Sequence, residues 1–272
     1  MARDLNKDTV LCISLAARPS NVGTRFHNHL YGALDLDFVY KAFAPRDIVD
    51  AVRGIRGLGI RGAAVSMPYK AVVLPLLDSI DVSAAEIGAV STIVNTDGHL
   101  RGFNTDVLAV QQLLATHRLR PDVPVALLGS GGMASACASA LARSNFTAVT
   151  VVARNREAGC ALADRHGWSW QDRAEPRYST IVNATPVGMA GGPEAELMPV
   201  DSTVIDHADT VFDVIAYPPD TPLLRYAAAQ NKHCISGAEV MVLQAVEQFV
   251  LYTGIRPTAE MIAAAAAFSQ QV

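Results

Sequence analysis

The segment Val123–Ala138 has the sequence VPVALLGSGGMASACA. Four apolar residues, Val125–Leu128, are followed at once by the turn Gly129–Ala134 and then by small residues at helical spacing. This order predicts a buried strand, a tight glycine turn and a helix. In dinucleotide-binding folds the glycines turn the chain and let the backbone approach a pyrophosphate, which binds at the positive end of the helix. A purely structural turn is the alternative, because any tight strand–helix connection uses glycine.

A second β-branched run follows at the distance that such folds require. Ala148–Ala153 reads AVTVVA and ends at Arg154-Asn155-Arg156. This is where an acidic residue binds the free 2′-hydroxyl of NAD, or an arginine accommodates the 2′-phosphate of NADP. The chain has two arginines and no acid there, and a planar guanidinium suits a phosphate. We therefore predict a preference for NADP, with two solvated loop arginines as the alternative.

Strands and helices alternate through the second half of the chain. The β-branched runs predict strands at Val125–Leu128, Val149–Val152, Thr180–Asn183, Thr203–Ile205, Val211–Val214 and His233–Ile235. This alternation is typical of a parallel, doubly wound sheet. Ala238–Thr253 then carries apolar residues over a broad helical face, which predicts a partly buried helix.

The first half predicts a second set of mixed elements. We expect strands at Thr9–Leu15, Phe38–Phe43 and Gly62–Val65, and a hairpin of Gly88–Val94 with Leu100–Phe103. The dipeptide Asp97-Gly98 would form the hairpin turn, for which it is a strong signal. We also expect a loop at Ala16–Thr24 and helices at Arg25–Leu34, Asp47–Gly54, Ala71–Leu77 and Val107–His117.

Composition excludes several classes of protein. The 272 residues are 50% hydrophobic and 18% charged, and the net charge of −4 argues against nucleic-acid binding. The four cysteines and seven histidines show no metal-ligand spacing, so we expect reduced thiols and no metal. The first ten residues lack an apolar core and no run reaches the roughly eighteen apolar residues of a membrane span. We expect a cytoplasmic protein that binds no membrane.

Several short motifs occur in a fixed order. They are Ser66-x-Pro68-x-Lys70, Gly88-Ala-Val-Ser-Thr92, Gly102-Phe-Asn104-Thr105-Asp106, the turn GSGGMA, Asn183-Ala-Thr-Pro-Val-Gly188-Met189, Asp213…Pro218-Pro-Asp-Thr221-Pro-Leu-Leu224 and Gly237-Ala-Glu-Val-Met241…Gln244. In this order they resemble the shikimate dehydrogenase family, from about residue 12 to residue 255. The resemblance implies fold class α/β with two domains. Residues 1–105 and 237–272 would form the substrate domain, and 106–236 a Rossmann-type NADP-binding domain.

The resemblance also implies an activity and its residues. The enzyme would oxidise a ring hydroxyl of shikimate, or reduce 3-dehydroshikimate, with NADP as the hydride partner. Lys70 and Asp106 match the catalytic pair. The positions matched to substrate binding are Ser20, Asn21, Thr24, Ser66, Ser91, Asn104 and Gln244. Those matched to cofactor binding are Gly129, Gly131, Gly132, Met133, Ala134, Arg154, Arg156, Asn183, Thr185 and Gly237.

The residue types of the catalytic pair agree with this chemistry. Removing a hydride from a secondary alcohol requires a general base for the hydroxyl proton, and a nearby carboxylate would orient a lysine. The alternatives are structural. Lys70 would be a solvated helix-start lysine, and Asp106 an N-cap of the helix beginning at Val107. Asn104 would be a turn residue, and Gln244 a polar residue on a helix rim.

Three departures from the family pattern fall on substrate recognition. The family's Ser-x-Ser-Pro-x-x-His-Asn loop has Asn21 and Gly23 in place of its serines, although Ser20 and Thr24 stand next to them. Its Gly-Ala-Val-Asn-Thr motif has Ser91 in place of asparagine, and its Tyr-Asn-Pro motif reads Ala216-Tyr217-Pro218. The chain thus resembles the shikimate dehydrogenase-like subgroup, and we predict weak activity on shikimate.

Other functions stay open. The protein could be a housekeeping shikimate dehydrogenase of aromatic amino-acid biosynthesis whose Ser20, Thr24, Ser91 and Tyr217 rebuild the anchor. It could be a non-catalytic NADP-binding regulator, or a dehydrogenase of another small molecule. The retained catalytic pair speaks against the regulator. We expect a monomer or homodimer with a cyclic hydroxy acid as its ligand.

Overall fold

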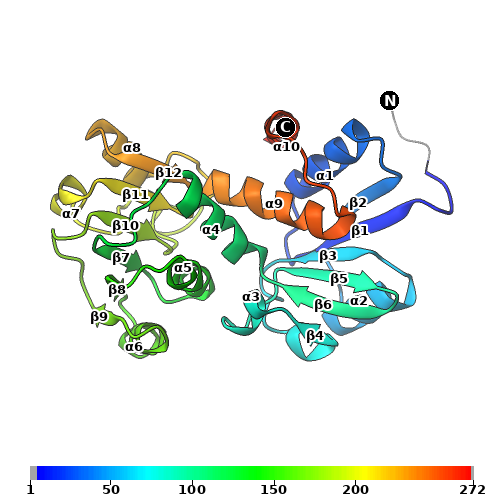
Figure 1. The fold of residues 1–272 in the computed structure, drawn as a ribbon, viewed down its shortest axis with the longest axis horizontal. Helices are drawn as coiled ribbons and strands as arrows, with labels where there is room; N and C mark the ends of the chain where they lie inside the picture. The colour runs from blue at the N-terminus through cyan, green and yellow to red at the C-terminus, as the bar shows by residue number, and fades with distance from the viewer. Residues whose placement is uncertain (1–4, 271–272) are drawn as a thin grey trace. The chain divides into compact units, whose positions relative to one another are not determined.

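The structure, a computed structural model, describes residues 5–270 and divides into two compact units (Figure 1). The first unit contains the chain up to Thr105 and the segment from Gln244 onward, and the second is Asp106–Leu243. The sequence placed the second boundary before residue 237, where helix α9 (Gly237–Thr253) begins. The division between the two compact units lies within α9, between Leu243 and Gln244, and the predicted domain boundary stays a prediction.

The first unit contains a mixed six-stranded sheet in the order β2-β1-β3-β5-β6-β4. Its strands are β1 (Val10–Leu15), β2 (Phe38–Phe43), β3 (Gly62–Val65), β4 (Ser79–Ile80), β5 (Thr92–Thr96) and β6 (His99–Phe103). Its helices are α1 (Asn21–Ala33), α2 (Ile48–Gly57), the short 3₁₀ helix η1 (Leu74–Leu76), α3 (Val82–Ala85) and α10 (Ala259–Gln270). Strands β1, β2 and β3 are parallel, whereas β5 runs antiparallel to both β3 and β6.

The predicted hairpin and its turn are confirmed, but the first strand is Thr92–Thr96 rather than Gly88–Val94. Thr96 pairs with His99, and the two turn residues Asp97 and Gly98 both have positive φ, of 51° and 89°. That conformation suits the twist of two-residue hairpins and explains the preference for this dipeptide. The side chain of Asn95 accepts a hydrogen bond of 2.8 Å from the Gly98 amide, which fixes the turn to the end of β5.

Two predictions in the first unit are wrong. Helix α1 begins at Asn21 rather than Arg25, with Ser20 extended at its N-cap position. Polar and glycine residues indicate a loop locally, but packing of the α1 face that follows them overrides that signal. The predicted helix at Ala71–Leu77 is instead a turn followed by η1. Pro75 has no N–H to bond the carbonyl of Ala71, so an α-helix is interrupted there.

Aromatic residues fill the core beside α1. His27 is fully buried and stacks on Tyr40, with ring centroids 4.3 Å apart. Burial lowers the pKa of His27 to about 3, an effect that Gln248 of α9 partly offsets. The next residue, Asn28, bonds the backbone N–H and C=O of Tyr40 at 2.9 and 2.8 Å and so joins α1 to β2. His27 and Asn28 therefore hold α1 against Tyr40 of β2, which fixes the position of the helix.

The second unit is a fully parallel six-stranded sheet in the order β12-β11-β10-β7-β8-β9. Its strands are β7 (Val125–Leu128), β8 (Val149–Val152), β9 (Ser169–Gln171), β10 (Thr180–Asn183), β11 (Thr210–Asp213) and β12 (His233–Ser236). Its helices include α4 (Thr105–Thr116), α5 (Gly132–Arg143), α6 (Arg156–Arg165), α7 (Ser202–His207) and α8 (Pro222–Ala229). The predicted α/β class with a doubly wound sheet is confirmed.

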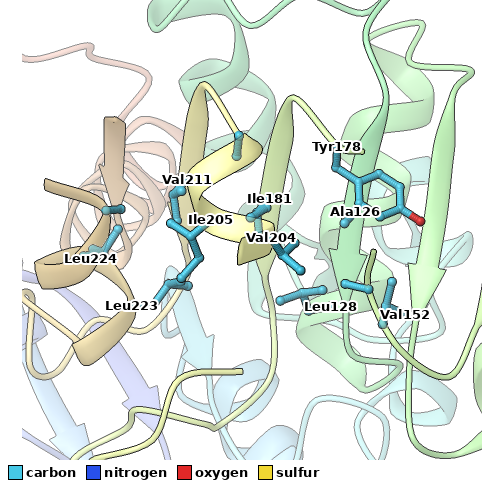
Figure 2. Close-up of a cluster of buried hydrophobic side chains, with 13 residues drawn as sticks. Ala126, Leu128, Val152, Tyr178, Ile181, Val204, Ile205, Val211, Leu223 and Leu224 are labelled. Atoms are coloured by element: carbon cyan, nitrogen blue, oxygen red, sulfur yellow. The ribbon is translucent and has the colours of Figure 1, made fainter. Parts of the chain in front are cut away.

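Figure 2 shows part of the core of this unit. Side chains of α7 and α8, including Ile205 and Leu223, lie against Ile181 and Val211 of the sheet. The predicted strand Thr203–Ile205 is wrong, because these residues belong to α7. Periodicity alone cannot distinguish a strand from a helix in so short an apolar run. In the structure, Val204 and Ile205 are neighbouring buried residues of the short helix α7.

Among the helices that the structure describes, none combines the length and apolar composition that a bilayer crossing requires.

Candidate active site

A glycine turn joins β7 to α5 in the second unit. Gly129 has a φ of +105°, and a Cβ there would lie 3.1 Å from the carbonyl oxygen of Ala184. A Cβ on Gly131 or Gly132 would have no neighbour within 4 Å. Gly131 occupies the N-cap position of α5, and no side chain caps that helix. The first N–H groups of α5 therefore face a space that a ligand can enter, which suits a pyrophosphate.

This turn lies where the strand order reverses. Strand β8 pairs with one edge of β7 and β10 with the other, so the connections that follow them diverge. A cavity of about 400 Å³ lies there, lined by residues that follow β7, β8 and β10. Its lining includes Gly129, Ser130, Gly131, Arg154, Asn155, Asp172, Thr185 and Glu194. Crevices at such reversal points are where open parallel sheets bind dinucleotides.

The two predicted cofactor arginines differ in position. Arg154 lines the cavity, and its guanidinium donates to both carboxylate oxygens of Glu194 at 3.2 and 3.4 Å. Arg156 begins α6, and its guanidinium lies over the Trp170 ring, 5.5 Å from the centroid. The cofactor role of both arginines stays a prediction, and only Arg154 is among the residues that line this cavity.

A buried polar network holds the ends of β10 and β11. Asn183 accepts hydrogen bonds from the N–H and hydroxyl of Thr185 at 3.1 and 2.7 Å. Its amide donates to the Asp213 carboxylate at 3.1 Å, which also accepts from the Thr221 hydroxyl at 2.7 Å and the Ile215 N–H at 3.1 Å. Asn183 and Asp213 are fully buried. The geometry supports a positioning function for Asn183, because it fixes Thr185 at the cavity wall.

Replacing Asp213 with asparagine is expected to flatten the pH dependence of stability. Burial raises the pKa of Asp213 from 3.8 to about 6, against the opposing hydrogen bonds from Thr221, Ile215 and Asn183. Because the folded state binds this proton more tightly, the stabilisation is complete below about pH 4 and is lost as pH rises through about 6. The difference between wild type and variant should change by at most about 3 kcal/mol across that range.

Tryptophan fluorescence provides the measurement, because Trp168 and Trp170 are the two tryptophans of the chain and both belong to the second unit. Urea unfolding at pH 4.5, 6 and 7.5 would be compared for wild type and Asp213→Asn. Parallel pH profiles would contradict a raised pKa. The asparagine can keep the contacts, because the Thr221 hydroxyl can rotate to accept from its amide.

Several predicted substrate residues of the first unit lie just after strands of its sheet. The pairing of these strands places their ends side by side at one edge of the sheet. Leu15 of β1 pairs with Val65 of β3, so the segments after these strands are neighbours. The Ala17 N–H donates to the Met67 carbonyl at 3.2 Å, which ties the two segments together. Lys70 is half-buried in the turn after β3, and its carbonyl accepts from the Val90 N–H at 2.8 Å.

Ser91 and Asn104 are held at the same edge. The Ser91 hydroxyl accepts from the Thr105 N–H at 2.8 Å and pairs with the Thr105 hydroxyl at 3.0 Å. The Asn104 amide donates to the Ala89 carbonyl at 2.9 Å, and its N–H donates to the Ser83 hydroxyl at 3.1 Å. Ser91 is fully buried, so its hydroxyl supports the Asn104–Thr105 backbone in this structure. Its substrate-binding role stays a prediction.

The predicted anchor residues lie at the start of α1 and after β3. Ser20 and Asn21 are exposed, and the Ser20 side chain does not cap the helix. Ser66 is also exposed. The Thr24 hydroxyl oxygen is buried and has no hydrogen-bond partner among the residues that the structure describes. An orphaned buried hydroxyl is costly unless something binds it, which singles Thr24 out among the four candidates.

Asp106 and Gln244, the two remaining predicted residues of the site, lie on helices α4 and α9. Asp106 is buried in the first turn of α4, which begins at Thr105. The alternative that it caps a helix beginning at Val107 is therefore wrong, although a carboxylate in the first turn still stabilises the helix. Lys70 belongs to the first unit and Asp106 begins the second. Gln244 lies on α9 and is half-buried.

Two residues that line the cavity, Asp172 and Glu194, were missed from the sequence. Glu194 is forty residues from Arg154, and no local pattern joins them. Asp172 follows β9, a three-residue strand that was itself not predicted.

Comparison with known proteins agrees with this architecture. Residues 21–93 match the family model of the shikimate dehydrogenase substrate binding domain. A shikimate dehydrogenase-like protein of Haemophilus influenzae is 49% identical over 98% of both chains. A shikimate dehydrogenase (NADP(+)) of Chlorobaculum tepidum is 35% identical over 84% of both chains.

Solved structures share the fold over nearly the whole chain. A shikimate 5-dehydrogenase-like protein superposes with a TM-score of 0.95 at 48% identity, covering 98% of this chain and 100% of that one. A 5-ketofructose reductase of Gluconobacter has a TM-score of 0.86 at 25% identity, covering 96% and 99%. A quinate dehydrogenase of Corynebacterium glutamicum in complex with NAD has a TM-score of 0.83 at 26% identity, covering 96% and 98%. With a relative half identical over almost all of its length, the chain belongs to the shikimate dehydrogenase family of oxidoreductases.

Proposed function

We propose that the protein is an NADP-dependent dehydrogenase that reversibly oxidises a ring hydroxyl of a cyclic polyol acid, with low activity on shikimate itself. The observation that carries the proposal is the 400 Å³ cavity, which combines the uncapped start of α5, Thr185 and the Arg154 guanidinium. A dinucleotide that carries a 2′-phosphate matches these three features. The relative named shikimate dehydrogenase (NADP(+)) supports the same cofactor.

The pyrophosphate and the 2′-phosphate of this cofactor each have a matching group in the chain. Gly129–Gly132 and the α5 N–H groups would hold the pyrophosphate, because Gly131 and Gly132 have no side chain and leave the space before the helix open. Arg154 would bind the 2′-phosphate. When bound, NADP⁺ supplies the acceptor for the hydride that leaves the substrate carbon. Lys70 would accept the hydroxyl proton, and the family resemblance assigns Asp106 to orient that lysine.

Weak shikimate activity follows from the altered anchor. Asn21 and Gly23 stand at two positions where the family pattern has serine, and both residues are helical in this chain. A lost hydrogen bond to a carboxylate costs roughly 1.5–3 kcal/mol, which is roughly ten- to a hundredfold in rate or affinity. The relatives named 5-ketofructose reductase and quinate dehydrogenase show that this fold is used with different polyol substrates.

A housekeeping shikimate dehydrogenase is the second candidate, and the Thr24 hydroxyl favours it. This buried oxygen has no partner among the described residues and stands next to the altered positions. It could therefore replace one of the missing serines as a carboxylate donor.

Initial rates with a panel of ring acids would test the proposal. NADP⁺ and NAD⁺ reduction would be measured with saturating shikimate, with quinate and with amino- or deoxy-substituted cyclohexane carboxylic acids. We expect slow turnover with shikimate, faster turnover with another member of the panel, and a preference for NADP⁺. Rapid shikimate oxidation that Thr24→Val abolishes would instead establish the housekeeping enzyme. Tight NADP⁺ binding without turnover of any substrate would contradict both.

A further inference from the structure

We propose that Glu194 controls selectivity between NADP and NAD by competing with the 2′-phosphate for the Arg154 guanidinium. This inference rests on the proposed use of NADP and adds a residue that opposes it. The residue comes from the loop after β10, whereas Arg154 follows β8. The fold thus brings a carboxylate to the phosphate-binding arginine although none occurs beside that arginine in the sequence.

The contact between the two side chains is two-pronged. Arg154 Nη1 lies 3.2 Å from Glu194 Oε1, and Nη2 lies 3.4 Å from Oε2. The paired donors of a guanidinium bind a carboxylate and a phosphate with the same geometry. Glu194 therefore occupies the Nη1–Nη2 edge of the guanidinium, and a 2′-phosphate can bind that edge only after this carboxylate moves away.

The exposure of the pair makes such an exchange feasible. The Arg154 side chain is 79% exposed, and that of Glu194 is 31% exposed. Exposed ion pairs are weak, so the contact can be broken at small cost. The backbone beneath Glu194 is nevertheless fixed, because its carbonyl accepts from the Gly188 N–H at 3.0 Å. The carboxylate consequently stays close to the site after the pair has opened.

The charge of the cavity decides which cofactor this arrangement favours. The charged residues among its lining are Arg154, Asp172 and Glu194, so acid exceeds base. A displaced Glu194 would repel a doubly charged 2′-phosphate, whereas a carboxylate can accept a hydrogen bond from the free 2′-hydroxyl of NAD. Glu194 therefore lowers the affinity for NADP while leaving the affinity for NAD unchanged or slightly higher.

The test is a binding measurement that needs no substrate. Dissociation constants of NADP⁺ and NAD⁺ would be determined by titration calorimetry for wild type, Glu194→Gln and Glu196→Gln. Glutamine keeps the size of Glu194 and removes its charge. Glu196 lies on the same loop, but its side chain is 89% exposed and its ion-pair partner is Arg225, which is not part of the cavity lining. It therefore controls for a general change of loop charge.

Glu194→Gln is expected to tighten NADP⁺ binding roughly three- to tenfold, with NAD⁺ binding unchanged or weaker. Glu196→Gln should change neither constant. In an Arg154→Ala background, the effect of Glu194→Gln on NADP⁺ selectivity should become smaller, because the competition for the guanidinium is gone and only the direct effect of the Glu194 charge on the 2′-phosphate is left.

Two results would overturn the inference. One is equal tightening of both cofactors by Glu194→Gln, which would indicate only a general electrostatic effect. The other is weaker NADP⁺ binding in that variant, which would make Glu194 a ligand rather than a competitor. The proposed NADP preference fails separately, if the wild-type protein binds NAD⁺ as tightly as NADP⁺. The proposed role of Arg154 fails if Arg154→Ala weakens the binding of both cofactors equally.

Discussion

Lys70→Ala is expected to lower kcat for oxidation of the ring hydroxyl by about 10²–10⁴-fold. Hydride removal from an alcohol carbon leaves a carbonyl only if the hydroxyl proton also leaves, and Lys70 is the group that we assign to accept it. Cofactor affinity should not change, because Lys70 is not among the residues that line the cofactor cavity. The loss should therefore appear in kcat, with an unchanged dissociation constant for NADP⁺.

The surroundings of Lys70 make this variant interpretable. Its backbone carbonyl is bonded to the Val90 N–H, and that contact does not depend on the side chain. Removal of the side chain should therefore preserve the turn and the sheet edge. Lys41→Ala is the matched control, since Lys41 is an exposed lysine on β2 of the same unit. That control should retain wild-type turnover.

A loss of less than about threefold in Lys70→Ala would be too small for a general base and would remove Lys70 from the mechanism. Asp106→Asn should also lower kcat, because the family resemblance assigns its carboxylate to orient Lys70. An unchanged kcat would instead indicate that Asp106 serves only the first turn of α4.

The strands of the second unit were predictable from the sequence. Val125–Leu128, Val149–Val152 and Thr180–Asn183 each have the predicted bounds, because buried parallel strands are continuous β-branched runs. Short elements whose conformation depends on tertiary packing were not predictable. Val204 and Ile205 illustrate this, since their helix forms where an apolar turn can be buried against the sheet.

The candidate site was predictable where one chain segment suffices to build it. The glycine turn and Arg154 are local features, and both line the cavity. Glu194 reaches Arg154 only because β10 pairs with β7 and β7 with β8. The contact can be predicted only if the order and pairing of these three strands are known. The spacing of residues along the chain does not contain that information. The segment Arg154-Asn155-Arg156 contains no acid, and only the fold brings the Glu194 carboxylate to Arg154.

Gly237→Ala is expected to destabilise the second unit by about 3 kcal/mol or more. Gly237 is buried at the junction of β12 and α9. A Cβ there would lie 2.3 Å from the carbonyl carbons of Val214 and Ile215, which follow β11. Real Cβ contacts are much longer, and backbone atoms cannot rotate away as a flexible side chain can. The junction would have to separate from the end of β11.

Gly132→Ala is the matched control for this prediction. Gly132 is also the first residue of a helix in the second unit, but a Cβ there has no neighbour within 4 Å. Its fold should therefore survive, while a methyl group in the space before α5 should weaken NADP⁺ binding. Urea unfolding followed by tryptophan fluorescence would separate the two variants. Equal midpoints for both would show that the backbone relaxes around Gly237, leaving cofactor approach as the reason for glycine at that position.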